Sequence, residues 1–431
     1  MSKLKFQSPK GMRDIFGKDQ EYFDKIYEVA KKIATFYGFK KIETPMLEDT
    51  ELFSKGIGLS TDVVRKQMFS FKTRGGDDLT LRPEGTAPIV RAYIEKGMRS
   101  FPGPSKFWYF GPMFRYEKPQ KGRYRQFWQF GLETMRESSV VRDAEIIAIF
   151  YEILKRLKIK NLIVEVSSIG DKCCRPDYVQ ILKKYLKSKK QYLCSNCLKR
   201  LKDNPLRVLD CKKKKCQIVV SQAPKIIDHL CKNCHKDFKD LLEFLEELEI
   251  PYILNPYLVR GLDYYTRTVF EIFSVDKDVQ NLSTKLALGG GGRYDLLIDL
   301  LGEKREEGTP AVGAALGIDR IAELMKKDGI VVGKKQKPQI FIAQVGALAK
   351  RKSLKLMGEF STARISVLEA FGKDSLRVQL KMADKSGVKY TLVLGQKEAL
   401  DGIILVRNMS TGKQTKVALD KIVGKMKRTL K

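Results

Sequence analysis

Histidine is scarce in this chain of 431 residues, which contains only His229 and His235. Both lie in a cysteine-rich stretch, so the rest of the chain offers no imidazole that could act as a general base. Nucleophilic mechanisms that pair a serine or a cysteine with a histidine are excluded there for the same reason. What remains is rich in arginine, at Arg115, Arg123, Arg260, Arg293 and Arg320, in strand-like or glycine-flanked contexts. Arginine keeps its charge and binds phosphate through a planar fork, which favours catalysis by positioned cations around a phosphoryl group.

Two further features are missing from the sequence. It has no glycine–lysine loop of the Walker type, which argues against a P-loop nucleotidase. No stretch approaches the roughly 18 apolar residues of a membrane span, and the first residues, MSKLKFQSPKGMRDIF, have no apolar signal core. We therefore expect a cytoplasmic protein with no membrane partner, whose cysteines are thiols or metal ligands rather than disulfides.

Acidic residues are also few, because 82 lysines and arginines face 51 aspartates and glutamates, a formal net charge of +31. Such an excess favours a polyanionic partner through long-range attraction. A lysine-rich host proteome would produce the same charge, so both interpretations stay open. The hydrophobic content of 43% indicates a folded, globular chain.

Hydrophobic periodicity predicts a mixture of helices and strands in the first three quarters of the chain. We expect helices at 21–39, 143–157 and 314–325, and strands at 40–45, 105–117, 122–135, 161–170 and 258–273. The glycine run from Gly289 to Gly292 is open to interpretation as a flexible turn. A lysine-rich stretch from Pro176 to Glu246 has a helical pattern and looks like an insertion.

These patterns divide the chain into domains. We predict a core at 1–325, an insertion at 171–250 within it, a linker at 326–337 and a separate domain at 338–431. The last domain has strand signals alternating with helical stretches, which is typical of a small α/β domain. The predicted fold class of the whole chain is α+β.

The stretch RYEKPQKGRYRQFWQFGLE, from Arg115 to Glu133, places cations, carboxylates and aromatic rings close together. Strand alternation puts Arg123, Arg125 and Phe127 on one face, and the residues from Pro119 to Gly122 predict a turn. The stretch is therefore expected to form a β-hairpin with a basic tip. An exposed hairpin with solvated charges is the alternative.

The insertion contains two C-x₂-C pairs, Cys194 with Cys197 and Cys231 with Cys234. Paired thiolates at this spacing are typical of structural Zn²⁺, held in a tetrahedron of four ligands. We favour these four cysteines as the ligands, with Cys211 or Cys216 able to substitute. A group of reduced thiols is the alternative, and Cys173 and Cys174 are assigned to the core, outside the cluster.

Three longer motifs resemble those of the histidyl-tRNA synthetases, which are class II aminoacyl-tRNA synthetases. They are LRPEGTAPIVRAY at 81–93, GPMFRYEKPQKGRYRQFWQFGLE at 111–133 and LVRGLDYYTRTVFE at 258–271. The segment ETPMLED around Pro45 is similar to the first class II motif, which usually forms the dimer interface, and AVGAALGIDRI is similar to the third. The C-terminal part resembles an anticodon-binding domain.

The resemblance implies a class II catalytic domain built on an antiparallel sheet, with a helical, cysteine-rich insertion and a C-terminal α/β anticodon-binding domain. It implies a histidine–tRNA ligase that activates L-histidine with ATP and Mg²⁺ and transfers it to tRNA-His, and that works as a homodimer. The implied residues for histidine binding are Glu84, Gly85, Thr86, Gln129, Glu133, Tyr264 and Tyr265.

The resemblance also implies an ATP site made of Arg115, Glu117, Arg123, Phe127 and Arg320. Arg115 would hold the α-phosphate, Glu117 would face the adenine amino group and Phe127 would stack on the adenine ring. The implied catalytic residues are Arg260, Arg115 and Gln129. The residues of both sites also have plainer structural alternatives. Tyrosines in a strand, such as Tyr264 and Tyr265, are often core residues, and Glu84 would also suit the first turn of a helix.

Two positions depart from the family pattern. Lys118 stands where arginine is frequent on the hairpin tip, so contact with the acceptor end of tRNA would lose bidentate geometry. Trp128 stands where a smaller ring is frequent, and we expect it to change packing rather than catalysis. The alternative function is a catalytically silent paralogue, the regulatory subunit of ATP phosphoribosyltransferase, which predicts a missing anticodon domain and an eroded site.

Overall fold

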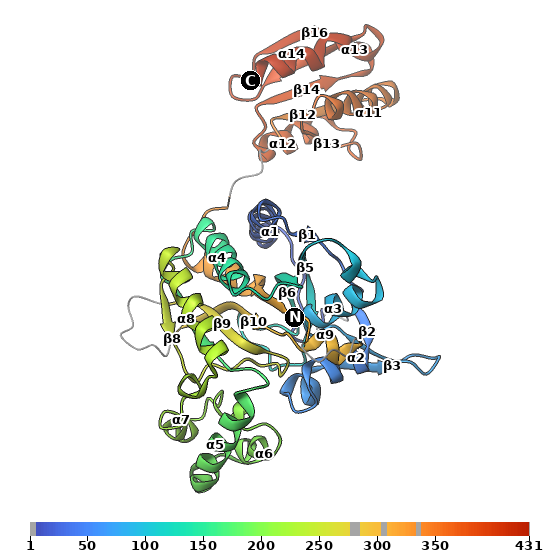
Figure 1. Cartoon of the computed structure of the whole chain (residues 1–431). Helices are drawn as coiled ribbons and strands as arrows, with labels where there is room; N and C mark the ends of the chain where they lie inside the picture. Colours follow the sequence, from blue (N-terminus) through green and yellow to red (C-terminus); the bar gives the residue numbers. More distant parts are fainter. Residues whose placement is uncertain (1–5, 276–284, 303–307, 333–337, 431) are drawn as a thin grey trace. The chain divides into compact units, whose positions relative to one another are not determined.

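The computed structural model describes residues 6–275, 285–302, 308–332 and 338–430. The chain forms two compact units, Met1–Val332 and Gly333–Lys431 (Figure 1). The first unit extends beyond residue 325, because its last helix, α10 (Ile318–Lys327), continues and Val332 is buried in its core. Residues 333–337 of the predicted linker lie outside the described residues.

An eight-stranded sheet forms the centre of the first unit, in the order β1-β5-β6-β11-β10-β9-β7-β8. Its inner strands pair antiparallel, whereas β1 and β8 add to the two sides in parallel. The strands are β1 (Lys40–Lys41), β5 (Ser105–Phe114), β6 (Gln126–Met135), β7 (Leu162–Ser168), β8 (Tyr252–Leu254), β9 (Thr266–Ser274), β10 (Leu286–Arg293) and β11 (Ala311–Gly317).

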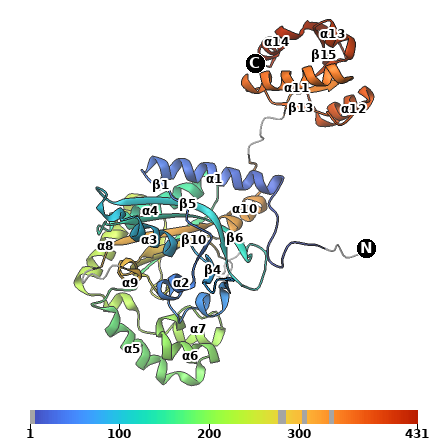
Figure 2. The same cartoon turned by 90° about the vertical axis from the view of Figure 1, so that its right-hand side faces the viewer.

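Helices cover one face of this sheet, with α1 (Lys18–Phe36) lying along it in Figure 2. Successive side chains of a strand point to opposite faces, so Trp128, Phe130 and Leu132 of β6 share the face that packs against the helices. Phe130 and Leu132 belong to one buried cluster with residues of α1, α4 (Val141–Arg156) and α10. Residues 127, 129, 131 and 133 therefore face away from the helices.

The predicted hairpin is present as β5 and β6, which pair from Ser105–Met135 to Phe114–Gln126. The expected turn is closed by a bridge between Gln120 and Arg123. Arg123 and Arg125 precede the start of β6, however, so their position follows from the turn and not from strand alternation. Trp128 packs edge-on against Phe23, at 6.2 Å between ring centroids, which agrees with a packing role.

Two predicted element boundaries were wrong, and the flexible turn that stayed open as an alternative for Gly289–Gly292 is not formed. The glycine run lies within β10, paired on both sides with β9 and β11. The helix expected at 314–325 begins only at Ile318, since residues 311–317 form β11. The strand expected at 258–273 begins at Thr266. Glycine and alanine have weak strand propensity, and here the pairing of backbone groups with neighbouring strands outweighs it.

Smaller elements complete the first unit. A three-stranded antiparallel sheet has the order β2-β4-β3, with β2 (Leu47–Asp49), β3 (Phe69–Lys72) and β4 (Asp78–Leu81). The helices beside it are α2 (Thr50–Ile57), α3 (Thr86–Glu95) and α9 (Leu297–Leu301), and Phe53, Ile57 and Ala87 form a buried cluster between them.

The insertion is helical, as expected. It consists of α5 (Arg175–Ser188), α6 (Ser195–Asp203), α7 (Lys214–Val220) and α8 (Lys232–Glu247), joined by short 3₁₀ turns. Tyr178 and Leu182 of α5 are fully buried, and the side of α8 that carries Leu241 and Leu245 packs into the main core.

The second unit is the expected small α/β domain. Its five-stranded sheet has the order β13-β12-β14-β15-β16, in which the first three strands are parallel and the last two antiparallel. The strands are β12 (Ile340–Gln344), β13 (Val367–Glu369), β14 (Tyr390–Leu394), β15 (Ile403–Asn408) and β16 (Gln414–Ala418), and the helices are α11 (Ala347–Thr362), α12 (Leu376–Ser386), α13 (Gln396–Leu400) and α14 (Ile422–Thr429). Strand β16 was not predicted. Among the helices of the described residues, none has the length and apolar character needed to cross a membrane.

Candidate active site

The open face of the main sheet has almost no side chains at its centre. Residues paired directly across strands share a face, and the pairs Gly131–Ala315 and Ala315–Gly290 place three small residues in a row. Gly313 lies beside Glu133, and a Cβ atom there would overlap the Glu133 carboxylate. The glycines therefore form a low floor on which large side chains from neighbouring segments can lie.

Two carboxylates are buried over this floor. Glu84 precedes α3 and accepts hydrogen bonds from the backbone N–H groups of Thr86 and Ala87, both at 2.8 Å. Glu133 of β6 accepts a hydrogen bond from the Thr86 hydroxyl at 2.7 Å and another from the Tyr294 hydroxyl. Glu84 thus does cap a helix, as the plainer interpretation had it, but it is also part of a polar cluster. Gly85, between Glu84 and Thr86, lets the ring of Tyr109 approach, since a Cβ atom at residue 85 would overlap it.

Burial makes both carboxylates weak acids. Desolvation raises the pKa of Glu133 from 4.5 to about 8, more than the hydrogen bonds from Tyr294 and Thr86 lower it. Desolvation also raises the pKa of Glu84, against the backbone hydrogen bonds of Ala87 and Thr86. At neutral pH Glu133 therefore holds a proton in the free protein, and it can donate or accept a hydrogen bond according to what approaches.

Four buried tyrosines surround the carboxylates: Tyr109, Tyr264, Tyr265 and Tyr294. The Tyr264 hydroxyl donates to Glu84 at 3.2 Å, and the rings of Tyr264 and Tyr265 lie 4.6 Å apart. Desolvation and the charges of Glu133 and Glu84 raise the pKa values of Tyr109, Tyr264 and Tyr294 well above 10. The cluster therefore presents neutral hydroxyl donors next to carboxyl groups, an arrangement suited to a small polar ligand with both donors and acceptors.

A second group of residues is cationic and lies at the hairpin tip and the start of α10. Arg115, Arg123 and Arg320 approach one another, so burial and the charges of Arg123 and Arg115 lower the pKa of Arg320. A group of guanidinium ions of this kind is suited to bind phosphate or another multiply charged anion. Arg115 donates to the carbonyl of Pro83 at 2.9 Å, and its guanidinium lies 5.4 Å from the Phe127 ring centroid.

Arg260 connects the two groups. Its guanidinium forms an ion pair with Glu271 at 3.1 Å and lies over Gly290, where a Cβ atom would meet it at 2.9 Å. Burial lowers the pKa of Arg260, but its interactions, first of all with Glu271, outweigh the burial and raise the pKa. Glu271 interacts with both Arg260 and Arg320. The Nε atom of Arg260 is buried without a partner among the described residues, so one donor is left for a ligand.

Gln129 and Glu117 are two further residues that the sequence analysis singled out as ligands. Gln129, on the same face of β6 as Glu133, has a buried amide oxygen without a partner in the described part of the chain. Glu117 forms an ion pair with Arg123 at 3.1 Å, which joins the two sides of the hairpin tip. The structure therefore brings the predicted histidine-binding and ATP-binding residues to one face of the sheet.

Sequence reasoning missed Tyr109, Tyr294 and Glu271 as residues of this site. Tyr294 lies two residues after the glycine run, and Tyr109 is the direct partner of Gly131 across β5 and β6. A large aromatic residue opposite a glycine in a hairpin is the signal that would have identified Tyr109, because the glycine leaves room for its ring. Tyr294 gave no comparable signal.

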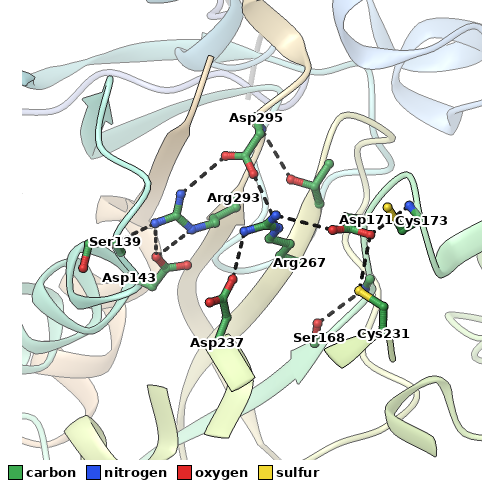
Figure 3. A network of polar contacts seen from close by, with 12 residues as sticks. Ser139, Asp143, Ser168, Asp171, Cys173, Cys231, Asp237, Arg267, Arg293 and Asp295 are labelled. Atoms are coloured by element: carbon green, nitrogen blue, oxygen red, sulfur yellow. Dashed lines mark hydrogen bonds and ion pairs between the residues drawn. The ribbon is translucent and has the colours of Figure 1, made fainter. Parts of the chain in front are cut away.

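Arg293 was counted among the candidate phosphate ligands, but its position excludes that role. Its guanidinium is buried, pairs with Asp143 at 2.8 Å and donates to the Ser139 carbonyl at 2.8 Å (Figure 3). It also pairs with Asp295, which lies 4.0 Å from Arg267. Arg293 is thus a structural cation that joins α4 to the end of β10.

The cysteines form two clusters and not the single one predicted. Cys194 and Cys197 meet Cys211 and Cys216, whereas Cys231 and Cys234 meet Cys174 and Asp171. The favoured set of Cys194, Cys197, Cys231 and Cys234 is corrected accordingly, and Cys174 is not a plain core residue. In the structure each C-x₂-C pair shares a helix N-terminus, and the sequence spacing alone does not show which pairs meet.

Comparison with known proteins agrees with this geometry. Residues 11–321 match the family model for histidyl-tRNA synthetase, and residues 339–429 match an anticodon binding domain. A histidine–tRNA ligase of Dehalococcoides mccartyi is 42% identical over 99% of this chain and 100% of its own length, and one of Caldicellulosiruptor saccharolyticus is 40% identical over 97% and 98%. The crystal structure of apo histidyl-tRNA synthetase from S. aureus has a TM-score of 0.79 and 33% identity, covering 98% of this chain and 100% of that one. The chain therefore belongs to the histidyl-tRNA synthetase family, whose members are aminoacyl-tRNA ligases of class II fold.

Proposed function

We propose that this chain activates L-histidine with ATP to histidyl-adenylate and then transfers histidine to tRNA-His. One observation carries the proposal: the pocket of carboxylates and tyrosines adjoins the arginine group, and Arg260 lies where the two meet. A ligand with a polar ring fits the first part and a polyphosphate fits the second. Joining them across Arg260 is the geometry that adenylate formation requires.

In the histidine half, Glu133 and Tyr265 hydrogen-bond the imidazole, with Tyr264 beside them. Glu133 holds a proton near neutral pH, so it can pair with a ring nitrogen as a donor or, after transfer, as an acceptor. Glu84, Thr86 and Gln129 receive the α-amino group, for which the unpartnered amide oxygen of Gln129 is suited. A ring of similar size without nitrogen atoms would leave these buried groups unpaired, which is a strong basis for specificity.

In the ATP half, Arg115 holds the α-phosphate, while Arg123 and Arg320 hold the outer phosphates. Phe127 stacks on adenine and Glu117 faces its amino group. Arg260 adds positive charge at the α-phosphate as the histidine carboxylate attacks it and diphosphate leaves, which stabilises the charge of the transition state. Mg²⁺ supplies screening of the leaving diphosphate, and Glu271, a carboxylate among the arginines, is suited to hold it.

For tRNA, the second unit supplies the anticodon-binding surface and the hairpin tip supplies contacts to the acceptor end. Lys118 is exposed on that tip, so its ammonium can pair with phosphate but without the fork of an arginine. The net charge of +31 is consistent with this partner.

We also assign a structural Zn²⁺ to Cys194, Cys197, Cys211 and Cys216. All four thiols are buried and their sulfur atoms lie within 4.8 Å of one another, with 3.9 Å between Cys194 and Cys211. A tetrahedron with Zn–S bonds of about 2.3 Å has edges of about 3.8 Å, so the group fits the ion. The bound ion would close the loop from Cys197 to Cys211, whose Asn204 and Arg207 contact Asp263 and the carbonyl of Arg260 at 3.1 and 3.0 Å.

A homodimer in the cytoplasm completes the proposal. Met46, Leu47 and Phe71 are exposed apolar side chains on or beside the small sheet, and the first two belong to the segment that resembles the first class II motif. Burying them against a second copy would remove apolar area from water. A cytoplasmic location accords with eight cysteines of which none forms a disulfide.

The deciding experiment is ATP–diphosphate exchange with histidine and with each other amino acid, followed by charging of tRNA-His. Exchange with histidine alone and charging of tRNA-His are the expected results. Protein that is folded and dimeric but supports no exchange would contradict the ligase assignment. That outcome would return weight to the silent regulatory paralogue, which the intact arginine group and the second unit now argue against.

A further inference from the structure

The second cysteine cluster lies at the base of the insertion, where the chain leaves the main sheet and returns to it. Asp171 and Cys174 precede α5, and Cys231 and Cys234 begin α8. One ligand atom from each residue lies within 4.8 Å of the others. This cluster belongs neither to the substrate site nor to the four-cysteine group inside the insertion.

The geometry fits a tetrahedral ion. The Asp171 Oδ1 atom lies 3.6 Å from the Cys174 sulfur and 4.0 Å from the Cys231 sulfur. A tetrahedron with a Zn–O bond of about 2.0 Å and a Zn–S bond of about 2.3 Å has an O–S edge of about 3.5 Å. Cys231 and Cys234 stand at the N-cap and third position of α8, as Cys194 and Cys197 do in α6, and a helix N-terminus stabilises thiolates.

The surroundings compensate the charge of such a site. The other oxygen of Asp171, Oδ2, pairs with Arg267 at 3.4 Å, while Oδ1 faces the Cys231 sulfur (Figure 3). Burial lowers the pKa of Arg175, and its proximity to Cys174, Asp171 and Cys234 opposes that shift, so this cation lies directly beside the cluster. A second partner that orients a ligand carboxylate is a regular feature of metal sites.

Both arginines also connect this cluster to the substrate site. Arg175 donates to the carbonyl of Tyr265 at 2.8 Å and to that of Gly170 at 2.9 Å. Arg267, two residues after Tyr265, has positive φ and pairs with Asp237 of α8 at 2.8 Å. The position of Tyr265 is therefore set by residues packed directly around the cluster.

We propose that Asp171, Cys174, Cys231 and Cys234 bind a second structural Zn²⁺, which fastens both ends of the insertion and thereby holds the segment from Tyr265 to Arg267. The chain then binds two structural zinc ions, which hold different segments in place. The site inside the insertion closes the loop that contacts Arg260, and the site at its base supports Tyr265. This assignment rests on the ligand geometry and does not require the proposed ligase activity.

Metal analysis of protein purified without chelator tests the proposal. We expect two equivalents of zinc per chain, and one equivalent in Cys234→Ser and in Cys216→Ser, because each variant disrupts a different cluster. Cys173→Ser is the matched control: Cys173 is exposed, and it contacts Asp171 through its backbone N–H, which the substitution keeps, so two equivalents should remain. One equivalent in the unaltered protein that persists in Cys234→Ser but is lost in Cys216→Ser would overturn the second site.

A substituted cysteine could prevent folding, so two measurements on the unaltered protein test the second zinc site independently of any variant. Alkylation followed by peptide mapping should find Cys174, Cys231 and Cys234 protected until a chelator is added, while Cys173 reacts throughout. Co²⁺ in place of Zn²⁺ should give thiolate-to-metal absorption for two sites. Hydrogen exchange in Cys234→Ser should rise at residues 265–267 and not at 204–207. Modification of the three thiols at the same rate with and without chelator would refute the assignment.

Discussion

Glu133 shows how burial gives a single residue its chemistry. Tyr294 and Thr86 supply hydrogen bonds, yet the cost of burying a negative charge still dominates and raises the pKa of Glu133 to about 8. The unfolded chain releases this proton near the ordinary value of 4.5. Stability contributed by protonated Glu133 is thus complete below about pH 4.5 and is lost as the pH rises through about 8.

Replacement of Glu133 by glutamine tests this directly. The amide resembles the protonated acid but does not titrate, so we expect the unfolding midpoint to fall less between pH 5 and pH 8 than in the unaltered protein. The KM for histidine should rise by about 10- to 100-fold, because a hydrogen bond to a group that can become charged is lost. Thermal unfolding and exchange assays at several pH values measure both effects. An unchanged pH dependence of stability would show that Glu133 is ionised in the folded protein.

Arg260 is the residue on which the chemical step depends most. Arg260→Ala should lower histidine-dependent ATP–diphosphate exchange by about 10²- to 10³-fold, since one positioned donor to the developing charge is removed. Binding of tRNA should persist, because most of its contacts lie elsewhere. Arg260→Lys retains the positive charge without the planar fork, so its exchange rate should lie between those of the unaltered protein and the alanine variant. Exchange retained by the alanine variant would refute the role of Arg260 at the α-phosphate.

At the scale of elements, β10 and β11 contribute to the site because their residues on the open face have almost no side chains. A floor of glycine and alanine keeps the strand backbones paired while large side chains from other segments cross above them. In the sequence the same glycines also allow a flexible turn, because propensity describes an isolated segment and not one held between two partners.

Gly313→Ala should disturb this floor. The added methyl group would meet the Glu133 carboxylate, so we expect a loss of about 1–3 kcal/mol in stability and a higher KM for histidine. Gly317→Ala, in the same strand, is the control for stability, since the nearest atom to its Cβ would be 3.7 Å away. Thermal unfolding of both variants gives the comparison. Equal melting temperatures would show that the floor tolerates side chains.

For the whole molecule, the division into two units predicts a division of labour. Each unit has its own buried cluster, with Ile340, Leu392 and Phe360 in the second. A chain that ends at Val332 should therefore keep histidine-dependent exchange within a few-fold, while charging of tRNA-His at low tRNA concentration falls strongly. Loss of exchange from a folded truncated chain would mean that the second unit is needed for activation.

The charge of the whole molecule makes its own prediction. If lysines and arginines contact the tRNA backbone, the logarithm of the binding constant should fall linearly with the logarithm of salt concentration, because counterions are released. Titrations of tRNA-His between low and physiological salt measure the slope. A nearly flat slope would assign the net charge of +31 to the composition of the host proteome.

The sequence by itself determined the family, the antiparallel fold and the hairpin between β5 and β6, because these depend on local motifs and on hydrophobic alternation. The residues that it singled out for histidine and ATP lie on one face of the sheet, while Arg293 was misjudged because its partner Asp143 is 150 positions away. Only the tertiary structure decided which cysteines meet, that the glycine run is a strand, and that Tyr109 and Tyr294 join the site. These features depend on contacts between distant segments, and the spacing of residues along the chain does not encode them.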